Sequence, residues 1–184
     1  MFRFLIIIFV LSFNNPVFSS TKEKIISQMQ FTNNLSFDFI QTINNENENG
    51  RCIIKYPGKI WCEYDNSNKK IIVSNGRSLV IKNSNRGNYY IYRLNKTPLQ
   101  YLLDKKYLIS KMKILEPKEI DGQYLNFKFF GNNNEINVFF DKNSLNLVGW
   151  QTEDIYQNLS VTFISSVKTN QEINNKIFIL PKNN

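Results

Sequence analysis

The stretch that decides the fold runs from Gly50 to Asn83 and reads GRCIIKYPGKIWCEYDNSNKKIIVSNGRSLVIKN. In it, runs of β-branched and aromatic residues alternate with short turn signals, a pattern typical of consecutive β-hairpins. The strongest turn signal is Asn75-Gly76, because this pair tolerates the positive φ angles that a two-residue hairpin turn requires. Tyr56-Pro57-Gly58 marks a second turn. The stretch therefore predicts strands that follow one another in an antiparallel meander.

The same pattern continues on both sides of this stretch and predicts a mainly β chain. The expected strands are 37–43, 51–55, 59–64, 70–74, 78–82, 89–94, 113–116, 123–130, 136–141, 145–152, 158–165 and 176–180. Two short amphipathic helices interrupt them. The first covers 22–31, with Ser20 or Thr21 as its cap, and the second starts at Thr97-Pro98 and runs to about Lys105. A single antiparallel sheet of about 11 strands must curl, and its concave side needs a cover.

The composition narrows the classes of function. The chain has 184 residues, a formal charge of +8, 28 asparagines, no alanine and no histidine. The length suits one domain. The absence of histidine excludes Ser-His-Asp hydrolysis, Cys-His chemistry and His-ligated metal sites. We therefore predict no catalytic residue, no metal site and no cofactor.

The first nineteen residues resemble an export signal. A basic start at Arg3 precedes the apolar run 4–13, and Val17 and Ser19 occupy the −3 and −1 positions of a cleavage site. We predict a signal peptide at 1–19 and a mature domain at 20–184, with a charge of +7 after loss of Arg3. An uncleaved anchor or a buried first element is the alternative.

The two cysteines flank the turn at 56–58. If these three residues form the loop, Cys52 lies opposite Cys62 on the same face of the sheet. Because an exported protein meets an oxidising compartment, a disulfide across this hairpin is geometrically sensible. Two reduced, buried thiols are the alternative.

Three segments carry a resemblance to a known family. They are the stretch 50–83, the segment Phe37-Asp38-Phe39-Ile40-Gln41-Thr42 and the segment Asn95-Lys96-Thr97-Pro98-Leu99-Gln100-Tyr101-Leu102-Leu103. Their order and spacing resemble the LolA family of periplasmic carriers of outer-membrane lipoproteins. The resemblance implies an incomplete, half-closed β-barrel with a lid of short helices. It also implies a periplasmic chaperone whose hydrophobic cavity shields the acyl chains of lipoproteins on their way from the inner to the outer membrane.

The resemblance also implies partners and site residues. The partners are lipoproteins, an inner-membrane ABC transporter that releases them, and an outer-membrane receptor or the outer membrane itself. We expect a monomer. Export, and basic residues that are scattered through the turns with no single stripe, argue against nucleic-acid binding. The side chains expected against acyl chains are Ile25, Ile26, Met29, Phe39, Ile54, Ile60, Tyr64, Leu79, Ile81, Leu99, Leu102 and Leu103. For each of them, ordinary core packing is the alternative.

One residue departs from the family pattern. The family often has an arginine directly before this proline, which ties the lid shut, whereas this chain has Tyr56 there, next to Lys55. Tyrosine offers one hydroxyl where arginine offers five donors. We therefore name Tyr56 as the candidate lid latch and expect a different closing contact, with the braced hairpin as a partial substitute.

Two other functions stay open at this point. An exported β-barrel for another lipid, or a regulator that senses lipoproteins, would share the curled sheet and the cavity. A hydrolase that uses only carboxylates would need two acids from the set Asp38, Glu63, Asp65, Asp141, Glu153 and Asp154. These acids fall at strand ends and turns with no shared motif.

Overall fold

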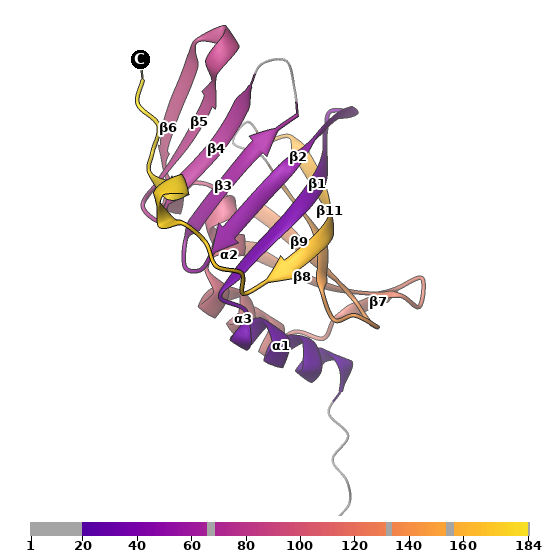
Figure 1. Ribbon diagram of the computed structural model, residues 1–184. Coiled ribbons are helices and arrows are strands. Elements are labelled where there is room, and N and C mark those ends of the chain that lie inside the picture. The colour runs from indigo at the N-terminus through magenta and orange to yellow at the C-terminus, as the bar shows by residue number, and fades with distance from the viewer. Residues whose placement is uncertain (1–19, 66–68, 132–133, 154–156, 184) are drawn as a thin grey trace, which may run out of the picture.

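The computed structural model describes residues 20–65, 69–131, 134–153 and 157–183, and shows one large antiparallel sheet with helices at one end of its concave side (Figure 1). The sheet has 11 strands in the order β6-β5-β4-β3-β2-β1-β11-β10-β9-β8-β7. Within the described residues its two outermost strands, β6 and β7, do not pair with each other, so the sheet is not closed. The predicted fold class, a curled antiparallel sheet forming an incomplete barrel with short helices, is confirmed. The predicted signal peptide at 1–19 lies outside the described residues.

The elements follow one another in the order of the sequence. The strands are β1 (Asn34–Ile43), β2 (Glu46–Lys55), β3 (Lys59–Tyr64), β4 (Lys70–Asn75), β5 (Ser78–Asn83), β6 (Asn88–Arg93), β7 (Lys118–Ile120), β8 (Tyr124–Gly131), β9 (Asn134–Asp141), β10 (Leu147–Glu153) and β11 (Leu159–Thr169). The α-helices are α1 (Thr21–Phe31), α2 (Leu99–Leu103) and α3 (Lys105–Ile114). Three single turns of 3-10 helix complete the chain: η1 (Ser84–Arg86), η2 (Leu94–Lys96) and η3 (Asn175–Phe178).

The first and last strands join two meanders into one sheet. Strands β1 to β6 form one meander and β7 to β11 the other, and β1 pairs with β11 along nearly its whole length. The partners run from Leu35 opposite Thr169 to Ile43 opposite Ser160, with a bulge between Ser36 and Asp38. This pairing curls the sheet, so that residues more than 100 positions apart share one concave face.

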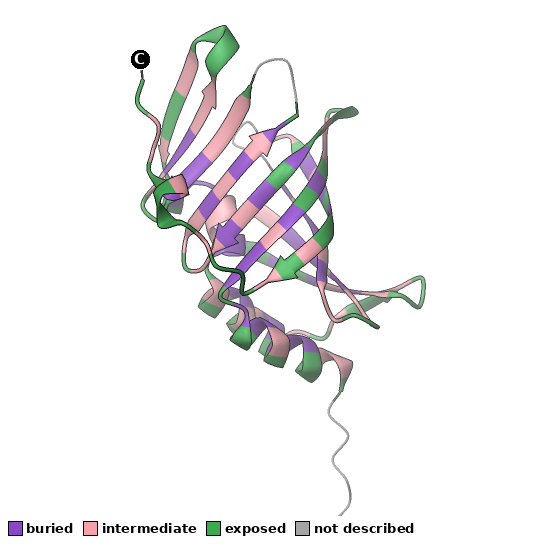
Figure 2. Cartoon of the chain, viewed as in Figure 1, coloured by how far each residue is buried: buried purple, intermediate pink, exposed green. Residues whose placement is uncertain are grey.

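Alternating burial along the strands shows which face covers the core (Figure 2). In β1, Phe37 and Phe39 are buried whereas Asp38 and Ile40 are exposed. The same period of two recurs in β8, where Phe127 and Phe129 point inward. The core therefore lies between the concave face of the sheet and the helices.

Helices α1 and α3 pack together at one end of the sheet. Helix α1 begins with a reciprocal cap, in which Glu23 N–H donates to Ser20 Oγ and Ser20 N–H donates to the Glu23 carboxylate. At its other end, the Lys105 ammonium donates to the backbone oxygens of Gln30 and Thr32, at 3.0 and 2.8 Å. These contacts bind the N-terminal helix to the start of α3 and neutralise carbonyls that a helix end leaves without partners.

Two predicted strands and the end of one predicted helix are wrong. Residues 113–116 fall on the end of α3 and the loop after it, and the next strand, β7, begins at Lys118. The second predicted helix stops at Leu103, and α3 starts anew because the Asp104 side chain accepts a hydrogen bond from Tyr107 N–H and caps it. Residues 176–180 hold the end of η3 and the segment after it rather than a strand.

The C-terminal segment crosses the outer face of the sheet near β3 and β4 (Figure 1). Phe178 is buried there, with the Lys59 ammonium 5.9 Å from its ring centroid. Further along, the Tyr89 hydroxyl donates to Pro181 O and the Lys82 ammonium donates to Lys182 O. The segment therefore ties together strands of the first meander from the side opposite the core.

Candidate functional site

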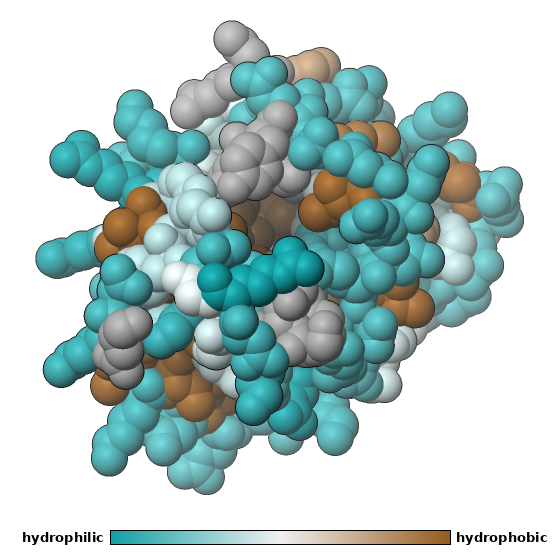
Figure 3. Space-filling model, turned by 90° about the horizontal axis from the view of Figure 1, so that it is seen from above, coloured by the Kyte–Doolittle hydropathy of each residue, from teal (hydrophilic) through white to brown (hydrophobic). Residues whose placement is uncertain are grey.

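A cavity of about 370 Å³ lies on the concave side of the sheet, above helix α2. Its apolar lining comes from all six strands of the first meander, from β10 and from the start of α2. These lining residues are Phe39, Ile43, Cys52, Ile60, Cys62, Tyr64, Ile72, Leu79, Ile81, Tyr90, Pro98, Leu99 and Trp150. Seen from above, the molecule is hollowed, with a hydrophobic floor inside a largely hydrophilic rim (Figure 3). The volume falls within the usual range of small-ligand sites.

The predicted acyl-contacting residues divide into two groups. Six of them line the cavity: Phe39, Ile60, Tyr64, Leu79, Ile81 and Leu99. The other six are buried in the continuous hydrophobic core instead: Ile25, Ile26, Met29, Ile54, Leu102 and Leu103. The sheet and the first turn of α2 therefore form the wall, and α1 supports it from below. Contact of any of the twelve with an acyl chain stays a prediction.

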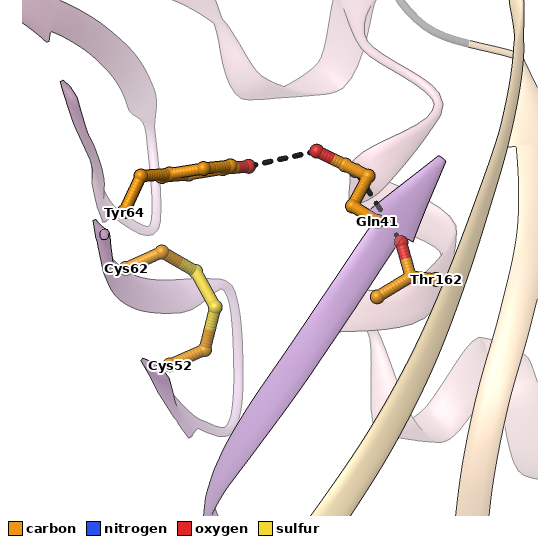
Figure 4. The surroundings of a disulfide bond; sticks show 5 residues. All are labelled: Gln41, Cys52, Cys62, Tyr64 and Thr162. Carbon is orange, nitrogen blue, oxygen red and sulfur yellow. Dashed lines mark hydrogen bonds between the residues drawn. A yellow bond between two sulfur atoms is a disulfide. The ribbon is translucent and has the colours of Figure 1, made fainter. Parts of the chain in front are cut away.

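The predicted disulfide is present and forms part of the cavity wall (Figure 4). Cys52 pairs directly opposite Cys62 in the β2–β3 ladder, with a Cα–Cα distance of 4.1 Å. The turn at 56–58 thus sets the register that the sequence predicts. Both cysteines are buried, at 5% and 4% exposed, so the cross-link braces the sheet from its inner face.

A chain of hydrogen bonds crosses the concave face near the cavity mouth (Figure 4). The Tyr64 hydroxyl donates to Gln41 Oε1 at 2.9 Å, and Gln41 Nε2 donates to Ser160 Oγ at 3.0 Å and Thr162 Oγ1 at 3.3 Å. Burial, with the negative charge of Glu48 as a second cause, raises the pKa of Tyr64 above its ordinary value. The phenol therefore stays protonated and keeps its role as donor.

Gly50 makes this crossing possible. It lies between Phe39 on β1 and Tyr64 on β3, and a Cβ there would lie 2.1 Å from the backbone oxygen of Glu63. Because no side chain fills the position, the Tyr64 ring stacks edge-on against Phe39, with centroids 4.9 Å apart, and reaches Gln41 beyond it.

Lys70 lies against the Tyr64 ring and adds a charged group next to this chain of hydrogen bonds. Its ammonium pairs with the Glu48 carboxylate and lies 3.9 Å from the Tyr64 ring centroid. Both side chains are mostly buried, at 18% and 30% exposed. The cation thus has a counter-ion and an aromatic face, and its charge is compensated within the protein.

We call residues 94–114 the lid, and a backbone hydrogen bond holds it to the sheet. Gly58 N–H in the β2–β3 turn donates to Leu103 O at the end of α2, at 2.9 Å. Tyr56, the candidate latch, packs against the core with the Lys105 ammonium 5.8 Å from its ring centroid. Burial raises the pKa of its hydroxyl. The latch role of Tyr56 stays a prediction, whereas the Gly58 contact is a hydrogen bond that sequence reasoning missed.

Sequence reasoning also missed the polar and aromatic side chains of the cavity. These are Gln41, Lys70, Asn83, Asn88, Tyr90, Thr97, Trp150, Thr152, Ser160 and Thr162. Period-two counting from Phe39 places Gln41 on the same face, so this residue had a readable signal. The residues of β10 and β11 had no such signal in the sequence. Their strands reach this side of the sheet only because β11 pairs with β1, which is distant in the sequence.

A second groove, of about 910 Å³, lies by the turns at Pro57 and Gly76 and the lid. Its lining includes Arg77, Arg93 and Lys106. This charged lining suits water or a polar partner, so the groove is a poor place for an acyl chain.

The candidate hydrolytic acids are engaged elsewhere or lie apart from the cavity, with one exception. Glu63 pairs with Arg51 at 2.7 Å on the surface, Asp65 accepts from Asn49, and Asp141 holds a turn. Glu153 lines the cavity, and Asp38 is exposed. Asp154 lies outside the described residues. In the part of the chain that the structure describes, no group of three or more Cys, Asp or Glu side chains could hold a metal ion, and no helix is long and apolar enough to cross a membrane.

An unclosed antiparallel sheet that curls around an apolar cavity, with a helical lid across one end, defines the class of lidded half-barrels. The chain belongs to the LolA family, since the model of the family described as outer membrane lipoprotein carrier protein LolA matches residues 30–180. The match covers both meanders, the lid and the C-terminal segment. The family that the sequence resembles is thus confirmed. Comparison with curated protein sequences found no match.

One matching solved structure shows a similar fold at very low sequence identity, and two others match more weakly. An uncharacterised conserved protein from Thermus thermophilus has a TM-score of 0.52 at 6% identity, covering 89% of this chain and 96% of the other. A LolA superfamily protein from Nitrosomonas europaea has a TM-score of 0.47 at 10% identity, covering 88% and 99%. A chain of the Pseudomonas aeruginosa MucA/MucB complex has a TM-score of 0.46 at 9% identity, covering 89% and 62%. At 6% identity, the similarity to the Thermus thermophilus protein concerns the fold alone.

Proposed function

We propose that this protein is a periplasmic chaperone that binds the acyl chains of lipoproteins in its cavity and carries them from the inner to the outer membrane. The observation that supports this proposal best is the apolar cavity between the sheet and the lid, on a chain of the LolA family. Such a cavity removes hydrocarbon from water and needs no reacting group. Binding and release are the whole function.

The energy of the cavity fits this role. Burying hydrocarbon yields about 0.8 kcal/mol per methylene, so a dozen methylenes contribute roughly 10 kcal/mol before the cost of ordering the chain. Transfer of an acyl chain from water into the cavity is therefore strongly favourable. Transfer from the cavity to a membrane, or to another cavity of similar polarity, changes the free energy little, so the chain can move on readily. Exchange by opening of the lid is therefore the expected conformational step.

The partners follow from the same proposal. An inner-membrane ABC transporter that releases lipoproteins would load the carrier, and an outer-membrane receptor or the outer membrane itself would accept the cargo. The positive charge of the chain favours acidic partners and anionic headgroups, because such surfaces attract and orient a basic protein. We propose that the carrier acts as a monomer.

The test is release of a labelled triacylated lipoprotein from inner-membrane vesicles by the purified mature protein. We expect release as a soluble one-to-one complex. Leu99 is the residue to change, because it lines the cavity at the start of α2, whereas Leu102 and Leu103 lie in the core. In Leu99→Asp, an acyl chain would desolvate a carboxylate, so release should fall at least about a hundredfold.

Leu159→Asp is the matched control, because Leu159 is 54% exposed and is not part of the cavity lining. It should release lipoprotein as well as the unchanged protein. Full release by Leu99→Asp would mean that the cavity is not the acyl site. If the unchanged protein releases no lipoprotein while a known carrier does, the lipoprotein proposal fails. Extraction and mass spectrometry would then identify the ligand of a different lipid-binding or lipoprotein-sensing protein.

A further inference from the structure

The cavity is layered, with polar side chains at its mouth and apolar ones below. Around the mouth, the inner face carries a polar belt, which we define as Gln41, Tyr64, Lys70, Asn83, Asn88, Thr152, Ser160 and Thr162. Strand register places neighbouring members side by side: Asn88 lies opposite Asn83, Ser160 opposite Thr152, and Thr162 opposite Gln41. Below the belt lie the disulfide and the aliphatic residues Ile60, Ile72 and Leu79.

Two belt residues present buried polar atoms without partners. In the described part of the chain, Thr152 Oγ1 and Asn83 Oδ1 are buried and make no hydrogen bond. Thr152 is only 8% exposed. Asn83 ends β5 and Thr152 lies in β10, so the two orphaned atoms belong to different parts of the same cavity lining. Because buried polar atoms in native proteins nearly always have partners, these two atoms indicate a polar group of the ligand. Two further belt residues, Gln41 and Tyr64, already form a hydrogen bond with each other.

The charges at the mouth disfavour an anionic ligand. Lys70 is the cation among the described lining residues, and Glu48 compensates it through their ion pair. Glu153 adds a carboxylate to the same lining. A ligand with a free carboxylate would therefore meet a negative charge and no available cation, whereas an uncharged ester or amide would meet hydrogen-bonding groups.

The volume limits how much hydrocarbon fits. A methylene occupies about as much space as a water molecule, whose share of the liquid is roughly 30 Å³. With the lid bonded to the sheet, a cavity of about 370 Å³ therefore holds on the order of twelve methylenes, which is the hydrocarbon of about one acyl chain. A triacylated cargo needs the additional space that opening of the lid would provide.

Building on the function proposed above, we propose that the cavity, while the lid is bonded to the sheet, binds one acyl chain, with an uncharged ester or amide linkage held at the polar belt by Thr152 and Asn83. The apolar depth takes the hydrocarbon, and the belt sets how far the chain enters. The cavity thus selects acyl esters and amides over free fatty acids.

The probes are monopalmitoylglycerol and palmitate, both below their aggregation limits. The two tryptophans of the chain allow a direct readout, because Trp150 lines the cavity and Trp61 does not. In a Trp61→Phe background, fluorescence of Trp150 reports occupancy of the cavity. We expect saturation at one monopalmitoylglycerol per protein and at least about tenfold weaker binding of palmitate at neutral pH.

Thr152→Val tests the belt itself, because valine keeps the shape and removes the hydroxyl. Losing the hydrogen bond to the ligand should weaken monopalmitoylglycerol binding by about three- to tenfold. Removing an unpaired buried hydroxyl should raise the thermal midpoint of the ligand-free protein by about 2 to 4 °C. Thr42→Val is the matched control, because Thr42 is not part of the cavity lining and bonds to Asn47. It should leave ester binding unchanged.

Each other outcome overturns a defined part of the reasoning. Unchanged ester binding in Thr152→Val, or a lower thermal midpoint, would refute the role of the belt while acyl binding stands. Equal affinity for palmitate and its glycerol ester would refute the selection against carboxylates. Saturation at two or more chains would refute the single-chain limit. If the unchanged protein binds neither probe, the proposed carrier function itself fails.

Discussion

Reduction of the Cys52–Cys62 disulfide should destabilise the protein by about 3 kcal/mol. The cross-link joins residues ten positions apart, and in the chain-entropy model a loop of this length restricts the unfolded chain by about 2.7 kcal/mol at 25 °C. The reduced thiols would stay buried as small hydrophobic groups on the inner face. The measured change therefore isolates the cross-link from the packing around it.

The assay is unfolding of the mature protein by urea and by heat, with and without a phosphine reductant, and circular dichroism monitors the loss of structure. For a chain of this size, the expected loss corresponds to a decrease of roughly 5 to 10 °C in the thermal midpoint. A Cys52→Ala, Cys62→Ala double variant is the control and should not respond to the reductant. Equal midpoints for the oxidised and reduced protein would show that the β2–β3 hairpin is already constrained in the unfolded chain, and would refute the calculation.

Two further predictions concern a tight backbone contact and a turn. Gly50→Ala should lower the free energy of unfolding by about 2 to 3 kcal/mol in urea titrations, because its Cβ would meet the Glu63 backbone oxygen at 2.1 Å; a change below about 0.5 kcal/mol would contradict this. The Asp141 carboxylate accepts hydrogen bonds from Asn143 and Ser144 N–H, which lowers its pKa. A lowered pKa stabilises the fold above about pH 4, where the unfolded carboxyl ionises, and this contribution is lost as the pH falls through the folded pKa. Stability of Asp141→Asn should therefore depend less on pH below about pH 4, and an unchanged acid profile would count against the assignment.

Local pattern was enough to predict the register of the β2–β3 hairpin and the disulfide, because the three-residue turn at 56–58 determines that pairing and period two assigns each side chain to a face. The hairpin signalled by Asn75-Gly76 is present, but its turn is shifted by one residue: Ser74 pairs with Leu79, so Gly76 and Arg77 form the loop, and of the predicted pair Gly76 has the positive φ. Helix α3 was not predicted, although Asp104 supplies a cap signal at its start. Its buried positions Leu108 and Met112 lie one turn apart on a helix of ten residues, which is too short a stretch for a clear helical period.

The cavity could be predicted only in part, for a physical reason. Side chains from β1, β2, β3 and β5 were assigned to the wall because those strands follow one another along the chain. Trp150, Thr152 and Thr162 reach the same cavity through the pairing of β1 with β11, which no local turn specifies. The layering of the mouth therefore became visible only in three dimensions.

This pairing also determines when the cavity comes into existence. A chain is synthesised from its N-terminus, and strands β1 to β6 can pair with one another as soon as they emerge. Strand β1 still presents an open edge then, and it finds its partner only when β11 arrives, more than 100 residues later. Until then the cavity lacks the side of its lining that β10 and β11 supply, including Trp150, Thr152 and Thr162. The complete lining therefore forms only once the two ends of the sheet-forming sequence have met.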